Sequence, residues 1–307
     1  MAETLEQMAL QGDPGTLASE EQAAKIQLLD PQQLYELWEK QHWLAHGIEL
    51  SRDQDHWIGL SDEERDWFVW GLASFFIGEE RVATQFSGLV MAYEDESEEA
   101  FLTTQQVDEA RHAQFFDRVY REVIGIEGDT WEQRLGRVRE ELNDAFVKLF
   151  DEELVEANQR LVRDPDDPEA KVDFVATYHM VIEGTLALTG QNFILDYLER
   201  NDLLPGFREG FGNIARDEHR HVAYGTWFLK EKCGDPAMAE RLRSRLHDLL
   251  PVASGVLVPK GADPENWTLL DYSAEQVNEF AFKALTRRLK AIGVPLISEA
   301  EAAGVPA

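Results

Sequence analysis

Apolar side chains recur every three or four residues along most of the chain, which is the spacing of one face of an α-helix. The run Trp67, Trp70, Phe75, Phe76 and Val82 is an example. Pattern, caps and chain breaks together predict a short helix that begins at residue 31 and longer helices at about 61–93, 97–123, 130–162, 169–200, 206–232, 235–250 and 274–292. The sequence therefore predicts an all-α fold.

Polar signals mark where these helices begin and end. Ser61 followed by Glu64 is a capping box, and Asp30 before Pro31 is a typical helix start. The segment 164–168, Asp-Pro-Asp-Asp-Pro, breaks the chain between two helices. We expect one helical domain over residues 30–293, a loosely ordered N-terminal segment over 1–29 and a C-terminal tail over 294–307.

Two pairs of long helices are predicted to form antiparallel hairpins. The polar run at 93–97 separates the first pair, and the segment 199–206, which contains Pro205-Gly206, separates the second pair. The helical region at 130–162 is expected to stand between the two hairpins.

Two copies of Glu-x-x-His lie on these helices, Glu109–His112 within DEARH and Glu218–His221 within DEHRH. Residues i and i+3 of a helix are about 60° apart around the axis and about 4.5 Å apart along it. Each pair can therefore direct a carboxylate and an imidazole at one point. Two such pairs that face each other would make a dinuclear metal site.

The spacing of two further glutamates supports this interpretation. Glu79 lies 30 residues before Glu109, and Glu183 lies 35 residues before Glu218. A turn near the middle of each interval brings the two glutamates of a hairpin to about the same level. One Glu from each of two helices, with Glu-x-x-His from each of two others, is the ligand set of ferritin-like dimetal four-helix bundles. The alternative is that these glutamates are solvated acids on helix faces.

The charge of this set favours a metal centre. Four carboxylates that converge in a bundle core are too costly to keep ionised without counter-charge. Two divalent cations would neutralise them and leave both imidazoles neutral. Carboxylate oxygens with only two nitrogens suit iron or manganese better than zinc or copper.

Two aspartates are candidates for holding the ligand histidines. Asp108 and Asp217 each precede the glutamate of a motif, and a carboxylate there can accept the second imidazole hydrogen of a histidine. The alternative is that both are surface acids. His219 points elsewhere on its helix and is expected to lie behind the ligands or at the surface. The remaining histidines lack partner spacing and are expected to be ordinary polar or core residues: His42, His46, His56, His179 and His247.

Composition sets the surroundings of this site. The chain has 307 residues, 44% of them hydrophobic, and a single cysteine. This length can bury a large helical core, and one cysteine excludes a disulfide framework. The N-terminal residues resemble no signal peptide, and no apolar stretch reaches the length of a membrane span. We expect a cytoplasmic protein.

The net charge is strongly negative. The chain carries 59 Asp and Glu against 29 Lys and Arg, a formal charge of −30. Nucleic acid is excluded as a partner, because no basic patch could persist in such a field. Only nine of the basic residues are lysine. An acidic, lysine-poor surface is typical of proteins from salt-accumulating organisms; an acidic mesophilic protein or a partner-docking surface is the alternative.

Several segments of the chain resemble a known family. They are GEERVATQ (78–85), DEARHAQFF (108–116), YHMVIEGTLALTG (178–190), LPGFREGFGNIARDEHRHVAYGTWF (204–228) and, more weakly, FAFKALTRRLKAIG (280–293). They are similar to the ligand-binding oxidases related to the small, radical-generating subunit of class I ribonucleotide reductase. The resemblance covers about residues 30–293.

The resemblance implies a mixed manganese/iron centre and a bound long-chain fatty acid whose carboxylate bridges the metals. Glu79, and not Glu80, matches the first ligand of the family. The manganese ligands would be Glu79, Glu109 and His112, with Glu109 as a bridge. The iron ligands would be Glu183, Glu218 and His221.

The resemblance also implies a covalent cross-link beside the metals. Val82 and Tyr178 match a valine and a tyrosine that become joined by an ether bond when the centre reacts with oxygen. From spacing alone, this pair would be an ordinary core contact. The implied function is an oxygen-activating oxidase that attacks an unactivated C–H bond, working as a homodimer with an electron donor that the sequence does not identify.

Two other functions remain as alternatives. A reductase small subunit often has a radical tyrosine four residues after the first ligand histidine, where this chain has Phe116. Such subunits also need a late tyrosine for radical transfer, and the last tyrosine here is Tyr272. A ferritin-like iron-storage protein is the second alternative; it would hold many metal ions per chain, and usually has a shorter sequence.

Overall fold

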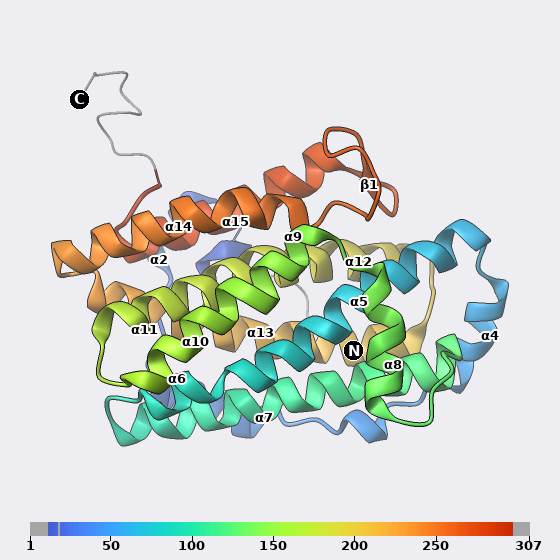
Figure 1. Cartoon of the computed structure of the whole chain (residues 1–307), viewed down its shortest axis with the longest axis horizontal. Coiled ribbons are helices and arrows are strands. Elements are labelled where there is room, and N and C mark those ends of the chain that lie inside the picture. Colours follow the sequence, from blue (N-terminus) through green and yellow to red (C-terminus); the bar gives the residue numbers. More distant parts are fainter. Residues whose placement is uncertain (1–11, 18, 297–307) are drawn as a thin grey trace.

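The computed structural model describes residues 12–17 and 19–296, and long helices run side by side along its longest axis (Figure 1). The central bundle consists of α5 (Asp62–Gln85), α7 (Glu96–Val119), the continuous segment α11–η6–α12 (Pro168–Val175, Ala176–Ala187 and Leu188–Arg200) and α13 (Pro205–Lys232). Helix α5 packs on α7, and α13 packs on η6 and α12. The predicted all-α, ferritin-like four-helix bundle with additional helices is confirmed.

The helices begin where the polar signals place them. The Ser61 side chain accepts a hydrogen bond from the Glu64 amide, and the Glu64 carboxylate accepts one from the Ser61 amide, which completes the capping box of α5. Asp30 caps the helix that starts at Pro31 in the same way. Asp95 caps α7 through two amides at the tip of the first hairpin.

Further helices surround the bundle. On the N-terminal side these are η1 (Pro14–Thr16), α2 (Glu20–Lys25), α3 (Pro31–Lys40), η2 (Ala45–Gly47) and α4 (Ser51–Gly59). After α13 come α14 (Pro236–Val256) and α15 (Ala274–Ile292), which lie along one side of the bundle in Figure 1. Both α14 and α15 pack on η6.

Two predicted helices are interrupted. The helix expected over 61–93 breaks at Phe86 and continues only as the short α6 (Ser87–Met91). The region expected over 130–162 forms five pieces: α8 (Trp131–Val138), η4 (Arg139–Glu141), α9 (Asp144–Val147), η5 (Lys148–Glu153) and α10 (Leu154–Arg163). Before it, the π-helical η3 (Tyr120–Ile124) ends the helix that begins with α7. The break after η4 has a local cause, since the Asn143 side chain caps α9 and donates to carbonyls at the end of α14. Helix α10 packs on α6 and on α11, one from each hairpin.

The helix expected over 169–200 contains a wide turn. Residues of η6 form a π-helix of 12 residues, with α-helix on both sides. A π-helix shifts the residues that follow it around the axis, and such segments often occur at functional sites. All but the last residue of η6 are buried, so this segment lies in the centre of the core.

The N-terminal segment is more ordered than expected. Within the segment 1–29, which was expected to be loosely ordered, residues 14–16 and 20–25 form η1 and α2, and Asp13 accepts two hydrogen bonds from Arg288 of α15. Both side chains are 0% exposed. A buried ion pair of this kind fixes the segment to the bundle, which composition alone could not indicate. Residues 1–11 and 18 lie outside the described residues.

A small hairpin lies at the upper side of the molecule in Figure 1. Strands β1 (Thr268–Leu269) and β2 (Tyr272–Ser273) pair antiparallel just before α15 (Figure 1). The sequence did not predict this hairpin, because each strand has only two residues. Within residues 12–17 and 19–296, none of the helices combines the length and apolar character that a membrane span requires. The expected tail at 294–307 lies mostly outside the described residues.

Candidate metal centre

The six predicted ligand residues meet in the middle of the bundle. They are Glu79 of α5, Glu109 and His112 of α7, Glu183 of η6, and Glu218 and His221 of α13. All six are buried. Their ligand atoms form two groups within which every atom lies within 4.8 Å of the others. The first group is Glu79, Glu109, His112 and Glu218; the second is Glu109, Glu183, Glu218 and His221. Two glutamates therefore belong to both groups.

The Nδ1 atoms of both histidines face the carboxylates. His112 Nδ1 lies 3.4 Å from Glu79 Oε2 and 3.4 Å from Glu109 Oε2. His221 Nδ1 lies 3.0 Å from Glu109 Oε1 and 3.3 Å from Glu183 Oε1. The two imidazoles therefore approach the same carboxylate, that of Glu109, each at a different oxygen.

Several of these converging atoms have no hydrogen-bond partner within the part of the chain that the structure describes. They are both Nδ1 atoms and the Oε2 atoms of Glu109, Glu183 and Glu218. Buried polar atoms are normally paired, so a set of orphaned acceptors around one point calls for a bound species. Two cations between the two groups would satisfy all of them. The residues present therefore fit a dinuclear metal site.

Electrostatics lead to the same conclusion. Burial raises the pKa of Glu79 to about 8. Burial, and then the negative charge of Glu218, raise the pKa of Glu183 well above its usual range. Without cations, these two carboxyls would hold protons at neutral pH. Metal binding would release such protons, because the ligand form of a carboxyl is the ionised one.

The two aspartates hold the histidines crosswise. His112 Nε2–H donates to Asp217 Oδ2 at 3.2 Å, and His221 Nε2–H donates to Asp108 Oδ2 at 3.3 Å. Each aspartate thus serves the histidine of the other motif. With metals bound, these bonds would hold the ring proton on Nε2 and leave both Nδ1 lone pairs directed at the centre.

Arg220 bridges the two aspartates. Its Nη2 donates to Asp108 Oδ2 at 3.0 Å and to Asp217 Oδ1 at 2.5 Å. Burial alone would raise the pKa of Asp217, but the Arg220 charge and the hydrogen bonds from His112 and Trp43 hold that pKa well below its usual range. A charged aspartate is the stronger acceptor, so it makes the histidine a better ligand.

Tyr178 also reaches the centre. Its hydroxyl donates to Glu109 Oε1 at 2.6 Å, and both side chains are fully buried. Burial, and then the charge of Glu109, raise the pKa of Tyr178 well above its usual range, so the phenol is protonated. Val82 is buried one turn after Glu79 on α5 and lines the pocket described next.

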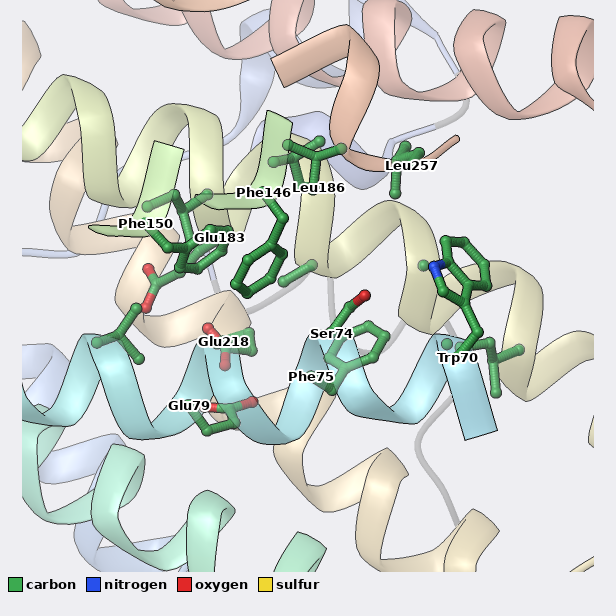
Figure 2. A pocket seen from close by; sticks show the side chains of 18 of the residues that line it. Trp70, Ser74, Phe75, Glu79, Phe146, Phe150, Glu183, Leu186, Glu218 and Leu257 are labelled. Carbon is green, nitrogen blue, oxygen red and sulfur yellow. The ribbon is translucent and has the colours of Figure 1, made fainter. Parts of the chain in front are cut away.

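An apolar pocket opens from the metal-ligand cluster (Figure 2). It contains about 700 Å³ of space that no atom fills, part of it open to solvent. Glu79, Glu183 and Glu218 lie at one end, with Phe150 beside Glu183, and Trp70 lies at the other end; Ser74 and Phe75 lie between them. Such a pocket, apolar with a few polar groups at defined points, is typical of a small-molecule site.

The other histidines take no part in the cluster. His219 is buried, but its Nδ1 donates to the Ala215 carbonyl at 2.6 Å and its Nε2 points toward Asp13, 3.9 Å away. His179 is buried beside Gln105, with 3.2 Å between His179 Nε2 and Gln105 Oε1. Neither His219 nor His179 belongs to the two ligand groups.

The match to known sequences decides the family. The profile of the family described as ribonucleotide reductase, small chain, matches residues 22–297, which is most of the chain. The chain belongs to this family.

The chain is also similar to solved structures of R2-like ligand-binding oxidases. It is similar to an R2-like ligand-binding oxidase with a valine-to-leucine substitution and an anaerobically reconstituted Mn/Fe cofactor, with 27% identity and a TM-score of 0.73 over 86% of this chain and 93% of that one. It is also similar to the R2-like ligand-binding oxidase of Sulfolobus acidocaldarius, with 25% identity and a TM-score of 0.70 over 89% of this chain and 93% of that one. The suspected resemblance is thereby confirmed.

Four residues that surround the candidate metal centre were not identified from the sequence. Trp38 Nε1 donates to Asp108 Oδ1 at 2.9 Å, and Trp43 Nε1 donates to Asp217 Oδ2 at 2.7 Å. Gln105 Nε2 donates to Glu183 Oε1 at 3.3 Å. For these three no signal exists, because their partners are distant in sequence. For Arg220 a signal exists: both DEARH and DEHRH have an arginine directly before the histidine.

Proposed function

We propose that this protein is an oxygen-activating dimetal oxidase that binds a long-chain, fatty-acid-like ligand. The observation that carries the proposal is the pair of ligand groups that share Glu109 and Glu218. Membership in the small-chain family and likeness to ligand-binding oxidases support an oxidoreductase. The apolar pocket that begins at the cluster supports a ligand with a long apolar chain.

The proposed ligands divide into two sets. Manganese would be held by Glu79, Glu109 and His112, and iron by Glu183, Glu218 and His221, with Glu109 as a bridge. Similar solved structures carry a Mn/Fe cofactor, which supports this choice of metals. When bound, such a metal pair supplies the electrons and the coordination positions with which oxygen is reduced. The protein's own part is to fix the coordination geometry through the Asp–His hydrogen bonds and to exclude water.

The proposal includes an ether cross-link between the Tyr178 oxygen and the Val82 β-carbon. The reaction breaks the phenolic O–H bond and the valine C–H bond and forms one C–O bond. Two electrons and two protons leave the pair, and oxygen is the electron acceptor. Glu109 is placed to receive the phenolic proton, because it accepts the hydrogen bond from Tyr178. The other two electrons for full reduction of oxygen come from the reduced metals, so an external donor is needed for any further turnover.

A radical-generating reductase subunit is the second candidate, because the family as a whole is described as the reductase small chain. The residue at the position of the usual radical tyrosine is Phe116, which is buried among Phe75, Phe207 and Phe211. This phenyl ring has no hydroxyl that could be oxidised to a stable radical. We therefore favour the oxidase.

Metal content tests the proposal. We expect two transition-metal ions per chain after loading with iron and manganese, measured by inductively coupled plasma mass spectrometry. Glu109→Ala or Glu218→Ala should remove most of this metal, because each glutamate belongs to both ligand groups. Glu80→Ala is the matched control: Glu80 is the neighbouring carboxylate, pairs with Arg81, and belongs to neither group.

Two outcomes would contradict the proposal. Full metal retention in both Glu109→Ala and Glu218→Ala would exclude the assigned ligands. Many ions per chain, in place of two, would favour the iron-storage alternative.

A further inference from the structure

The far end of the pocket carries two unpaired hydrogen-bond donors. The indole nitrogens of Trp67 and Trp70 are buried and have no hydrogen-bond partner among the described residues. Both tryptophans line the same pocket as the metal-ligand glutamates, and Trp70 is only 9% exposed. In Figure 2 the Trp70 nitrogen is turned toward the side on which Ser74 and Leu257 lie.

This arrangement is unusual for an apolar pocket. A buried indole N–H usually has a partner, because an unpaired donor has lost its hydrogen bond with water and gained none in return. A phenylalanine at either position would place an aromatic ring on the wall without an unpaired donor. Two unpaired donors on one wall therefore indicate an acceptor that the protein itself does not contain.

The position of the donors along α5 is defined by the helix. Glu79 lies nine residues after Trp70, so the two levels are about 14 Å apart at 1.5 Å per residue. Trp67 lies nearly one turn beyond Trp70. Gly71 has no side chain, and the Trp67 ring lies over it, 3.0 Å from where a Cβ would stand. The two indoles therefore lie next to each other at the far end of the pocket, with ring centroids 5.8 Å apart.

We propose that the ligand is a long-chain carboxylic acid with a hydroxyl or keto oxygen near the middle of its chain, bound by Trp70 and Trp67. This inference rests on the proposed function, in which the carboxylate lies at the metals. An extended polypeptide backbone spans at most about 3.6 Å per residue, which has three bonds, or roughly 1.2 Å per bond. We use the same length per bond for the extended acyl chain of the ligand. About eleven or twelve bonds therefore cover the distance between Glu79 and Trp70, which places the oxygen near carbon 10 to 12.

The rest of the pocket fits such a molecule. Between its two polar ends, the walls are phenyl rings and aliphatic side chains, among them Phe146, Phe150 and Leu186. An apolar chain would bury its methylenes there. A hydroxyl or keto oxygen accepts hydrogen bonds, which is what an indole N–H requires. A site built to bind an oxygen discriminates against an analogue that lacks it, because its donors are then left unpaired.

Calorimetric titration of metal-loaded, delipidated protein tests the proposal. The probes are 12-hydroxystearic acid, 12-oxostearic acid and stearic acid, which share one chain length. We expect the two oxygenated acids to bind about fivefold to tenfold more tightly than stearic acid, as one or two new hydrogen bonds would give. In the double variant Trp67→Phe and Trp70→Phe, which keeps an aromatic ring at each position but removes the N–H donor, the preference should fall below about twofold.

Trp57→Phe is the control, because it removes an indole N–H from a tryptophan that packs on the core outside the pocket lining. This variant should keep the full preference. Equal affinity of the wild-type protein for stearic and oxygenated acids would overturn the inference, as would a preference that persists in the double variant. If the wild-type protein binds none of the three acids, the ligand pocket of the proposed function fails as well, so the two failures are distinguishable.

Discussion

At the residue scale, the hydrogen bond from Tyr178 to Glu109 joins a protonated phenol to a carboxylate of the candidate metal centre. Val82 follows Glu79 by three residues and lies on the pocket wall beside it. Mn/Fe-loaded protein that is exposed to oxygen should therefore lose the mass of two hydrogen atoms as the ether forms. Intact-mass measurement detects this loss, and a tryptic digest should contain the two peptides covalently joined.

Tyr178→Phe is the control for this reaction. It removes the oxygen that forms the ether and keeps the ring that stacks on Phe174. Neither this variant nor anaerobic wild-type protein should contain joined peptides. If oxygen-exposed, metal-replete wild-type protein yields only separate peptides, the cross-link proposal is wrong and the reductase alternative becomes stronger.

Residue-scale chemistry was predictable where it depends on spacing within one helix. The i, i+3 pairs and the hairpin spacings were sufficient to bring together Glu79, Glu109, His112, Glu183, Glu218 and His221. The crossed pairing of Asp108 and Asp217 was not predictable, because it depends on how α7 and α13 face each other. The tryptophans that bind these aspartates lie on other elements, and no pattern in the sequence connects them.

At the scale of elements, the π-helix η6 is held by a contact from outside it. Arg288 of α15 donates to the carbonyl of Gly184, the residue after Glu183. Its Nε and Nη2 groups donate to the carboxylate of Asp13. The guanidinium is fully buried. This side chain therefore joins the N-terminal segment, the last helix and the element that supplies one candidate ligand.

Removing Asp13 should strongly destabilise the fold. Asp13→Ala leaves the Arg288 charge buried without a partner, and such losses amount to about 3–5 kcal/mol in the free energy of unfolding. Urea denaturation followed by circular dichroism measures this change. In the same experiment Asp271→Ala, which removes a partner of exposed Arg200, should cost less than about 1 kcal/mol.

A second comparison separates charge from packing. The double variant Asp13→Leu and Arg288→Met replaces the ion pair by apolar groups and should recover much of the lost stability. If Asp13→Ala were no more harmful than Asp271→Ala, the N-terminal segment would not be a stabilising part of the domain.

Element boundaries were predictable where the signal is local. The capping box at Ser61 and the start at Pro31 are sequence features, and the structure uses both. The π-helix was not predictable, since α and π turns accept the same buried apolar residues and the choice depends on tertiary contacts such as Arg288 to Gly184. The break at Asn143 has the same kind of cause, a contact with the end of α14.

At the scale of the whole molecule, the all-α bundle followed from periodicity, but the pocket did not. Its walls come from α5, η6 and α12, with Phe146 and Phe150 from the interrupted region and Leu269 from β1. These segments are far apart in sequence, and only their packing creates the cavity. The same holds for the short β1–β2 hairpin, whose strands are too short to have a pattern.

The net charge of −30 is a property of the whole molecule that predicts how stability depends on salt. Repulsion among the excess acids opposes the compact state, and salt screens it, with a Debye length of about 10 Å at 0.1 M and about 3 Å at 1 M. We expect the melting temperature to rise from low salt to molar KCl, most steeply at the lower concentrations.

A double variant tests this charge effect. Glu156 and Glu199 are exposed acids, and replacing both by glutamine makes the net charge less negative without loss of side-chain volume. This variant should be more stable than the wild-type protein at low salt and should gain less from KCl. A melting temperature that stays flat or falls across the range would contradict the halophilic interpretation.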